Sequence, residues 1–210
     1  MEITNNENSE KAKKTEISSS LSYEVVDFGN MRAVEKKEKM ENLLVGRNFV
    51  VLDVGPGGER TNLSVSQRKG DLWIGVDRAI NANNIDFRKG SLRIDEDTKR
   101  VIVPGYTDEL PDVKVDLIMM VAPNPQSIVE EGLLSDIERF CKKGTQLFIL
   151  LDNRTRESQF YGKKAMKVLA EFLENNNFDP DDLAIGDRKI DTSSSRDAIG
   201  GRVVTACKFR

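Results

Sequence analysis

Short apolar runs alternate along the chain with longer segments in which apolar and polar residues mix at helical spacing. Four of these runs are almost continuously apolar, at residues 49–54, 72–77, 115–121 and 146–151. Strands of this kind are buried on both faces, as in a parallel sheet that is covered by its crossover connections. Val101–Val103 adds a further short strand. The pattern therefore predicts an α/β protein built on a mainly parallel sheet.

The segments between the strands predict amphipathic helices. Residues 31–45 place one helix ahead of the first strand, and residues 162–176 place another near the end. Residues 127–143 predict a single helix that is closed by Gly144 at its C-cap. The segment 60–69 predicts only a weak helix, because its threonine and serines are poor helix formers.

The pattern changes in two further parts of the chain. Residues 78–100 are compatible with a short helix followed by a hairpin. Near the C-terminus, residues 183–190 and 202–209 predict two strands that are joined by the polar segment 191–201. We expect these two strands to pair as an antiparallel hairpin.

Composition places the chain among single-domain proteins. With 210 residues, it is long enough to bury a sizeable core, which we assign to residues 23–210. Residues 1–22 are rich in Asn, Glu, Lys and Ser and predict a disordered tail. The net charge of −3 does not indicate a nucleic-acid partner, although a local basic patch stays open.

Several classes of chemistry and location are disfavoured. The chain has no histidine, and Cys141 and Cys207 lie far apart, so we expect neither imidazole catalysis nor a metal site. No apolar run approaches the ~18 residues of a membrane span, and the N-terminus lacks the apolar core of a secretory signal. We therefore expect no membrane association and a cytoplasmic location. A polar secretion signal within residues 1–22 is the alternative to a cytoplasmic location.

A glycine-rich turn directly follows the first strand and carries the candidate chemistry. Gly55–Gly58 has three glycines in four positions, which lets a ligand approach the backbone near a helix N-terminus. Asp53 precedes this turn, and Asp77 ends the second strand 24 residues later. That separation is close to the ~20 residues expected between a nucleotide-binding turn and its ribose-binding acid. A carboxylate there can accept hydrogen bonds from two neighbouring hydroxyls.

Four motifs in this order resemble those of class I S-adenosylmethionine-dependent methyltransferases: Val51–Gly58, Trp73–Asp77, Thr107–Pro111 and Val115–Ile118. They are similar to the family's acid-glycine turn, its second strand with a terminal acid, its acid-x-Leu-Pro segment and its fourth strand. The resemblance covers residues 45–210. It implies a Rossmann-like three-layer sandwich with a mostly parallel seven-stranded sheet and a C-terminal antiparallel hairpin. It also implies S-adenosyl-L-methionine as the cofactor.

The resemblance further implies roles for particular residues. The methionine part of the cofactor would lie against Asp53, Gly55, Pro56 and Gly57. The ribose would bind Asp77, and the adenine would lie near Asp108.

The acceptor side is assigned to the loop that follows the fourth strand. Ala122 would line the cofactor site, and Pro123 and Asn124 would act at the transfer site. In amino-group methyltransferases, an Asn or Asp side chain and a proline carbonyl accept hydrogen bonds from the target amine at this position. Here Asn124 is followed by a proline and Gln126, without the second proline and the aromatic residue of that motif. The acceptor therefore stays unidentified: a small molecule, or an amino group of nucleic acid or protein.

Other interpretations of these motifs remain open. The glycine turn also fits a plain strand-helix connection or the site of another nucleotide, although Arg60 breaks the G-x-G-x-x-G pattern. The incomplete acceptor motif also fits a non-catalytic cofactor-binding or scaffold protein. A polyamine synthase that uses a decarboxylated cofactor is disfavoured, since Ala122–Gln126 contains no acid. Asp152–Arg156, after the fifth strand, is a second surface for an anionic substrate or a solvated loop.

Overall fold

The computed structural model describes residues 22–56, 70–78, 98–121, 123–130, 132–152, 156–178, 184–190 and 199–207. The strands in this part of the chain are β1 (Glu24–Val25), β2 (Phe49–Val54), β3 (Asp71–Asp77), β4 (Lys99–Pro104), β5 (Leu117–Val121), β6 (Gln146–Asp152), β7 (Ala184–Ile190) and β8 (Ile199–Cys207). The helices are α1 (Ala33–Leu44), α2 (Pro125–Glu130), α3 (Leu133–Glu138), α4 (Arg156–Asn175) and the 3₁₀ turn η1 (Thr107–Glu109).

The described strands form one sheet in the order β1-β4-β3-β2-β5-β6-β8-β7. The strands from β1 to β6 pair in parallel, as expected from their continuous apolar runs. β8 pairs antiparallel with both β6 and β7. The predicted Rossmann-like α/β fold with a mostly parallel sheet is thus confirmed. The C-terminal hairpin as a unit stays a prediction, because the connecting residues 191–198 lie outside the described part.

The strand count differs from the prediction. Eight described strands take part in the sheet, whereas seven were expected. The additional strand is β1, whose two residues pair with Val101 and Ile102 of β4 at the sheet edge. Two residues carry no readable hydrophobic period, so the sequence pattern could not reveal this strand.

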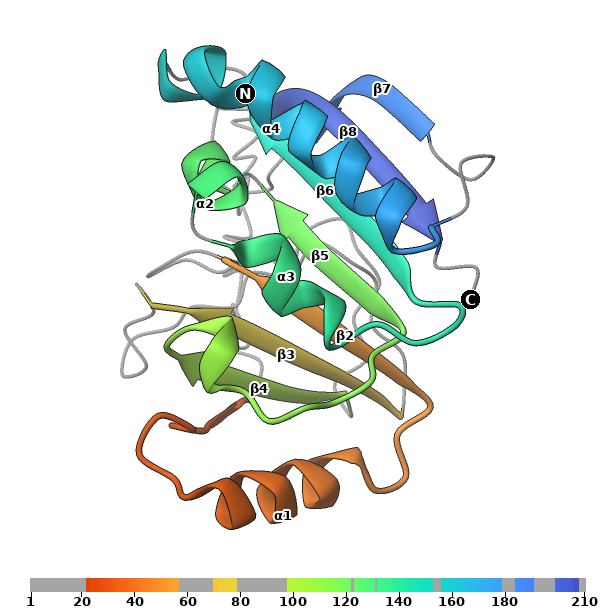
Figure 1. The fold of residues 1–210 in the computed structure, drawn as a ribbon. Helices are drawn as coiled ribbons and strands as arrows, with labels where there is room; N and C mark the ends of the chain where they lie inside the picture. Colours follow the sequence, from red (N-terminus) through yellow and green to blue (C-terminus); the bar gives the residue numbers. More distant parts are fainter. Residues whose placement is uncertain are drawn as a thin grey trace, which may run out of the picture.

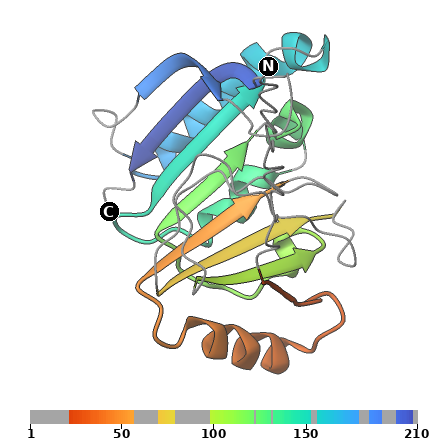
Figure 2. The ribbon, with the colours of Figure 1, turned by 180° about the vertical axis from the view of Figure 1, so that it is seen from behind.

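Both faces of the sheet are buried. On one face, side chains such as Leu52, Ile74 and Ile118 are fully buried together with residues of the helices. Figures 1 and 2 show α2, α3 and α4 on this face, with α1 along the β4 side of the sheet. On the opposite face, Trp73 and Ile102 are fully buried as well. The helix predicted at 60–69, which the three-layer arrangement requires, lies outside the described residues.

The helix predicted over 127–143 is wrong as a single element. The chain forms two short helices, α2 and α3, on either side of Gly132, whose φ of +67° is left-handed. The carbonyl of Gly132 accepts hydrogen bonds from the backbone N–H groups of Ser135 and Asp136, which starts α3 afresh. α3 then ends at Glu138, so Gly144 is not its C-cap. By contrast, α1 and α4 occur where helices were predicted.

Candidate cofactor-binding site

The strand order contains a topological switch point between β2 and β5. From β2 the chain proceeds outward through β3 to β4, and then returns to the other side of β2 with β5. Crossover connections leave in opposite directions at such a point, which opens a crevice at the carboxyl ends of the strands. A ligand of an open α/β sheet is therefore expected there.

A cavity of about 510 Å³ lies at this point. Its described lining comes from the carboxyl ends of β2, β3, β4 and β5 and from the helices behind them. The lining residues are Val54, Gly55, Val76, Asp77, Arg78, Gly105, Tyr106, Thr107, Asp108, Pro123, Asn124, Ser127, Leu133 and Asp136. The volume lies within the ~300–1,000 Å³ range of pockets that enclose cofactor-sized molecules.

The glycine turn meets this cavity at Gly55. Its backbone N–H donates to the carbonyl of Val76 at 2.9 Å, which ties the turn to β3. Gly55 has a left-handed φ of +72°, and no atom lies within 4 Å of the position where a Cβ would stand. The position thus favours glycine for its backbone conformation and leaves open space beside it. Pro56 follows but is not in the lining, and Gly57 lies outside the described residues.

Two predicted acids reach the cavity from neighbouring strands. Asp77 is the last residue of β3 and is paired in register with Pro104 at the end of β4. Asp108 lies on η1, which follows β4, and its side chain is exposed. Both line the cavity, and their roles toward the ribose and the adenine stay predictions. Arg78 and Tyr106 lie beside them and contact each other, with the guanidinium 6.0 Å from the ring centroid.

Asp53 is placed differently from these acids. Its side chain is fully buried beside Trp73, whose indole Nε1 donates to Oδ2 at 3.3 Å. The other oxygen, Oδ1, accepts no hydrogen bond from the described residues. Burial raises the pKa of this carboxyl to about 7, and the nearby negative charge of Asp77 acts in the same direction. Asp53 is not in the described lining, so its role toward a ligand stays a prediction.

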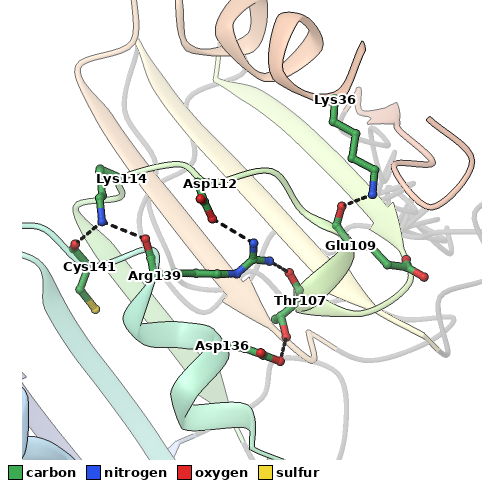
Figure 3. Close-up of polar contacts among 8 residues, drawn as sticks. All are labelled: Lys36, Thr107, Glu109, Asp112, Lys114, Asp136, Arg139 and Cys141. Carbon is green, nitrogen blue, oxygen red and sulfur yellow. Dashed lines mark hydrogen bonds and ion pairs between the residues drawn. The ribbon is translucent and has the colours of Figure 1, made fainter. Parts of the chain in front are cut away.

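A polar network holds η1 against α3 (Figure 3). The hydroxyl of Thr107 donates to Asp136 Oδ2 at 3.1 Å, and the Arg139 guanidinium donates to the carbonyl of Thr107. Arg139 also donates to Asp112 Oδ1 at 3.1 Å, so one side chain joins the start of η1 to the segment that follows it. Because Asp108 follows Thr107 directly, these contacts determine where Asp108 meets the cavity.

Two lysines extend this support to neighbouring elements. Lys114 Nζ donates to the carbonyls of Arg139 and Cys141, both at 3.0 Å, and so binds the chain just after α3. Lys36 Nζ of α1 donates to the carbonyl of Glu109 at 2.8 Å. The turn that carries Asp108 is therefore held from two sides.

The loop after β5 supplies the third predicted group. Pro123 and Asn124 both line the cavity, and Ala122 lies outside the described residues. The side-chain Oδ1 of Asn124 accepts the backbone N–H of Gln126 at 2.9 Å, an Asx-type turn at the start of α2. This oxygen keeps a second lone pair, so the side chain retains capacity for one more hydrogen bond.

Some lining residues were missed from the sequence. Asp136 and Ser127 lie within the segment that was predicted as a single amphipathic helix. The structure divides this segment at Gly132 and places both residues in the cavity lining. Arg78 directly follows β3 and Tyr106 lies two residues after β4, and this closeness to strand ends was the available signal.

Two kinds of feature are absent from the described residues. In this part of the chain, no group of three acidic, His or Cys side chains is arranged to hold a metal ion. Nor does any helix there combine the length and apolarity that a membrane span requires.

Comparison with known proteins gives a fold relationship. The sequence matches no protein-family model and no curated protein. Among solved structures, the 16S rRNA (adenine(1408)-N(1))-methyltransferase from Catenulisporales acidiphilia is similar, with a TM-score of 0.53 and 16% identity over 86% of this chain and 95% of that chain. A mutant of that enzyme with its cosubstrate SAM gives 0.53 and 17% over 86% and 93%.

The 16S rRNA methyltransferase KamB is also similar, with a TM-score of 0.51 and 15% identity over 82% of this chain and 94% of that chain. The chain therefore has the class I SAM-dependent methyltransferase fold, and its cavity lies at the switch point of that fold.

Proposed function

We propose that this protein is an S-adenosyl-L-methionine-dependent methyltransferase. The observation that carries the proposal is the cavity at the switch point, which is lined by Gly55 after β2, Asp77 at the end of β3 and Asp108 on the η1 turn after β4. These residues were selected from sequence motifs alone, and they come from segments far apart in the chain.

The cavity fits the cofactor in volume and charge. The charged side chains of its described lining are three carboxylates, Asp77, Asp108 and Asp136, and one guanidinium, Arg78. An acidic surface complements a molecule that carries a sulfonium and an ammonium group. When bound, the cofactor would supply an electrophilic methyl group on a positively charged sulfur.

The residues of the chain would bind and orient the reactants. Asp77 would accept hydrogen bonds from the two ribose hydroxyls, and Asp108 would accept one from the adenine amino group. Gly55 would leave room for the methionine part. Pro123 and Asn124 would hold the acceptor in line with the reacting bond, which supplies much of the acceleration in such a transfer.

A non-catalytic cofactor-binding protein is the second candidate. The observation that favours it is the hydrogen bond from Gln126 to Asn124, because this gives the Asn124 side chain a structural role. Bound cofactor would then occur without transfer.

A transfer assay separates the two candidates. The protein is incubated with methyl-labelled S-adenosylmethionine and fractionated cell extract, and labelled acceptor and S-adenosylhomocysteine are measured. If the protein is a methyltransferase, both products should form, and Asp77→Asn should strongly lower the amount of each. Glu41→Gln, an exposed charge change on α1, is the control and should leave them unchanged. Cofactor binding without either product in any fraction would favour the second candidate.

A further inference from the structure

One face of α4 combines an exposed aromatic ring with lysines. Phe160, Lys163, Lys164 and Lys167 follow the spacing i, i+3, i+4 and i+7, so they share one side of the helix. All four are exposed, and Phe160 reaches 80%. We call these four residues the α4 stripe. The other side of α4 packs on the core through Ala165, Leu169 and Phe172.

The ring of Phe160 contacts one neighbouring ring and is otherwise exposed to solvent. It contacts Tyr161 edge to face, with the centroids 5.0 Å apart and an interplanar angle of 79°. A single exposed apolar side chain is common at protein surfaces and needs no function. An exposed aromatic ring among cations indicates a function more specifically, because proteins that bind single-stranded nucleic acid combine these two groups.

Positive charge is concentrated just before α4 and in its first half, and helix stability does not explain this distribution. Residues 154–167 contain five basic side chains and one acid, in a chain whose net charge is −3. Within α4 the bases lie toward the N-terminal half, while Glu171 and Glu174 lie near the C-terminus. The helix dipole acts mainly within the first and last turns, so it does not account for lysines in the middle of α4. The Lys167–Glu171 pair, at 3.7 Å, has the less favourable orientation.

The helix that carries the α4 stripe lies next to the acceptor side of the candidate site. α4 follows the carboxyl end of β6 and packs on α2, which begins directly after Pro123 and Asn124. Figures 1 and 2 show the first turns of α4 extending past the carboxyl end of β6, on the side of α2.

We propose that the α4 stripe binds an unpaired segment of RNA, with phosphates on the lysines and a base stacked on Phe160. Unpaired bases in loops and bulges are the parts of RNA that aromatic side chains recognise. RNA is then the class of methyl acceptor, and this conclusion rests on the proposed function. The proposal that the α4 stripe binds RNA does not depend on the proposed function. The exposed ring would supply stacking that the Asn124 motif lacks.

Fluorescence anisotropy with a labelled single-stranded RNA of about 12 nucleotides tests the proposal, since such a length spans one stacking site and its flanks. Phe160→Ala should weaken binding roughly tenfold or more, and Phe160→Tyr should retain it. Phe160→Leu should behave like Ala, since stacking requires a ring. Retained affinity in Phe160→Leu would overturn the stacking role.

The lysines are tested through salt dependence. The double variant Lys163→Gln/Lys164→Gln should lower the slope of log affinity against log salt by about 1.4, at ~0.7 per phosphate contact. Lys37→Gln/Lys143→Gln removes the same charge from exposed positions on α1 and before β6, and should leave the slope unchanged. Equal effects of the two pairs would overturn the assignment to α4.

Two further arms separate the outcomes. Tighter binding of single-stranded DNA or of an RNA duplex than of single-stranded RNA would overturn RNA with unpaired bases as the ligand. Calorimetry with S-adenosylmethionine should give the same affinity for Phe160→Ala as for the wild type, because Phe160 is not in the described lining. RNA binding without any cofactor binding would remove the proposed function and leave the RNA site standing.

Discussion

At the scale of single residues, folding moves the carboxyl of Asp53 from water into the protein interior. It is fully buried, accepts a hydrogen bond from Trp73, and its pKa is raised to about 7. An acid with this pKa keeps its proton in the folded chain at pH values where the unfolded chain has released it. Folding is therefore coupled to proton binding at this position.

The coupling predicts how stability depends on pH. Between the ordinary pKa of 3.8 and about 7, the folded state binds the additional proton, so the contribution of Asp53 to the free energy of unfolding falls as pH rises. The loss is about 1.4 kcal/mol per pH unit across that window and levels off above it. Asp53→Asn keeps an acceptor for Trp73 and should remove this fall. Urea unfolding from pH 5 to pH 8 measures it, and equal slopes for both proteins would contradict the assignment.

Gly55 gives a second prediction at this scale. Gly55→Ala forces a left-handed backbone on an L-residue, at a cost of about 1 kcal/mol in unfolding free energy. Because Gly55 lines the cavity, the new methyl group should also weaken binding of S-adenosylmethionine. Gly46→Ala is a matched control, since Gly46 has a similar φ of +69° and open space around it but lies outside the cavity lining. An equal loss of affinity in both variants would contradict a role of Gly55 in the site.

At the scale of elements, the sequence predicted strands better than connections. The strands from β2 to β6 were readable because burial on both faces requires continuous apolar runs. The break between α2 and α3 was not readable. Val129, Leu133 and Ile137 are apolar at positions i, i+4 and i+8, so their spacing continues a helical pattern across Gly132. Likewise, motifs identified Asp77 and Asp108, whereas Asp136 depended on the tertiary position of α3.

The break itself is testable. Gly132→Ala should lower the free energy of unfolding by about 1 kcal/mol, because φ is +67° and no neighbouring atom would clash with the methyl group. Gly132→Asn should cost less, since Asn adopts this conformation more readily. Chemical denaturation of the three proteins measures the order. A stabilised Gly132→Ala would mean that α2 and α3 can join as one helix.

Arg139 tests how the elements position the site. Arg139→Gln removes the donors that hold the η1 segment at Thr107 and Asp112. It should lower the free energy of unfolding by about 1 kcal/mol and weaken S-adenosylmethionine binding through Asp108. In an Asp108→Asn background, the same substitution should have little further effect on binding. Additive losses of affinity would contradict this coupling.

At the scale of the whole molecule, the strand order determines where a ligand can bind. The reversal between β2 and β5 opens the carboxyl edge at one place, and the described cavity lies there. α1 lies outside the cavity lining but helps to position the site, because Lys36 donates a hydrogen bond to the carbonyl of Glu109 in η1. The helix that carries the α4 stripe packs on α2, which begins directly after Pro123 and Asn124.

Calorimetric titration of the wild type and of Asp77→Asn with S-adenosylmethionine tests the central claim most directly. The wild type should bind one equivalent, and Asp77→Asn should bind roughly tenfold or more weakly, since hydrogen bonds to a charged group contribute ~1.5–3 kcal/mol. Circular dichroism of both proteins establishes that the variant is folded. No heat of binding with the folded wild type, or equal affinities for the two proteins, would contradict the assignment of this cavity.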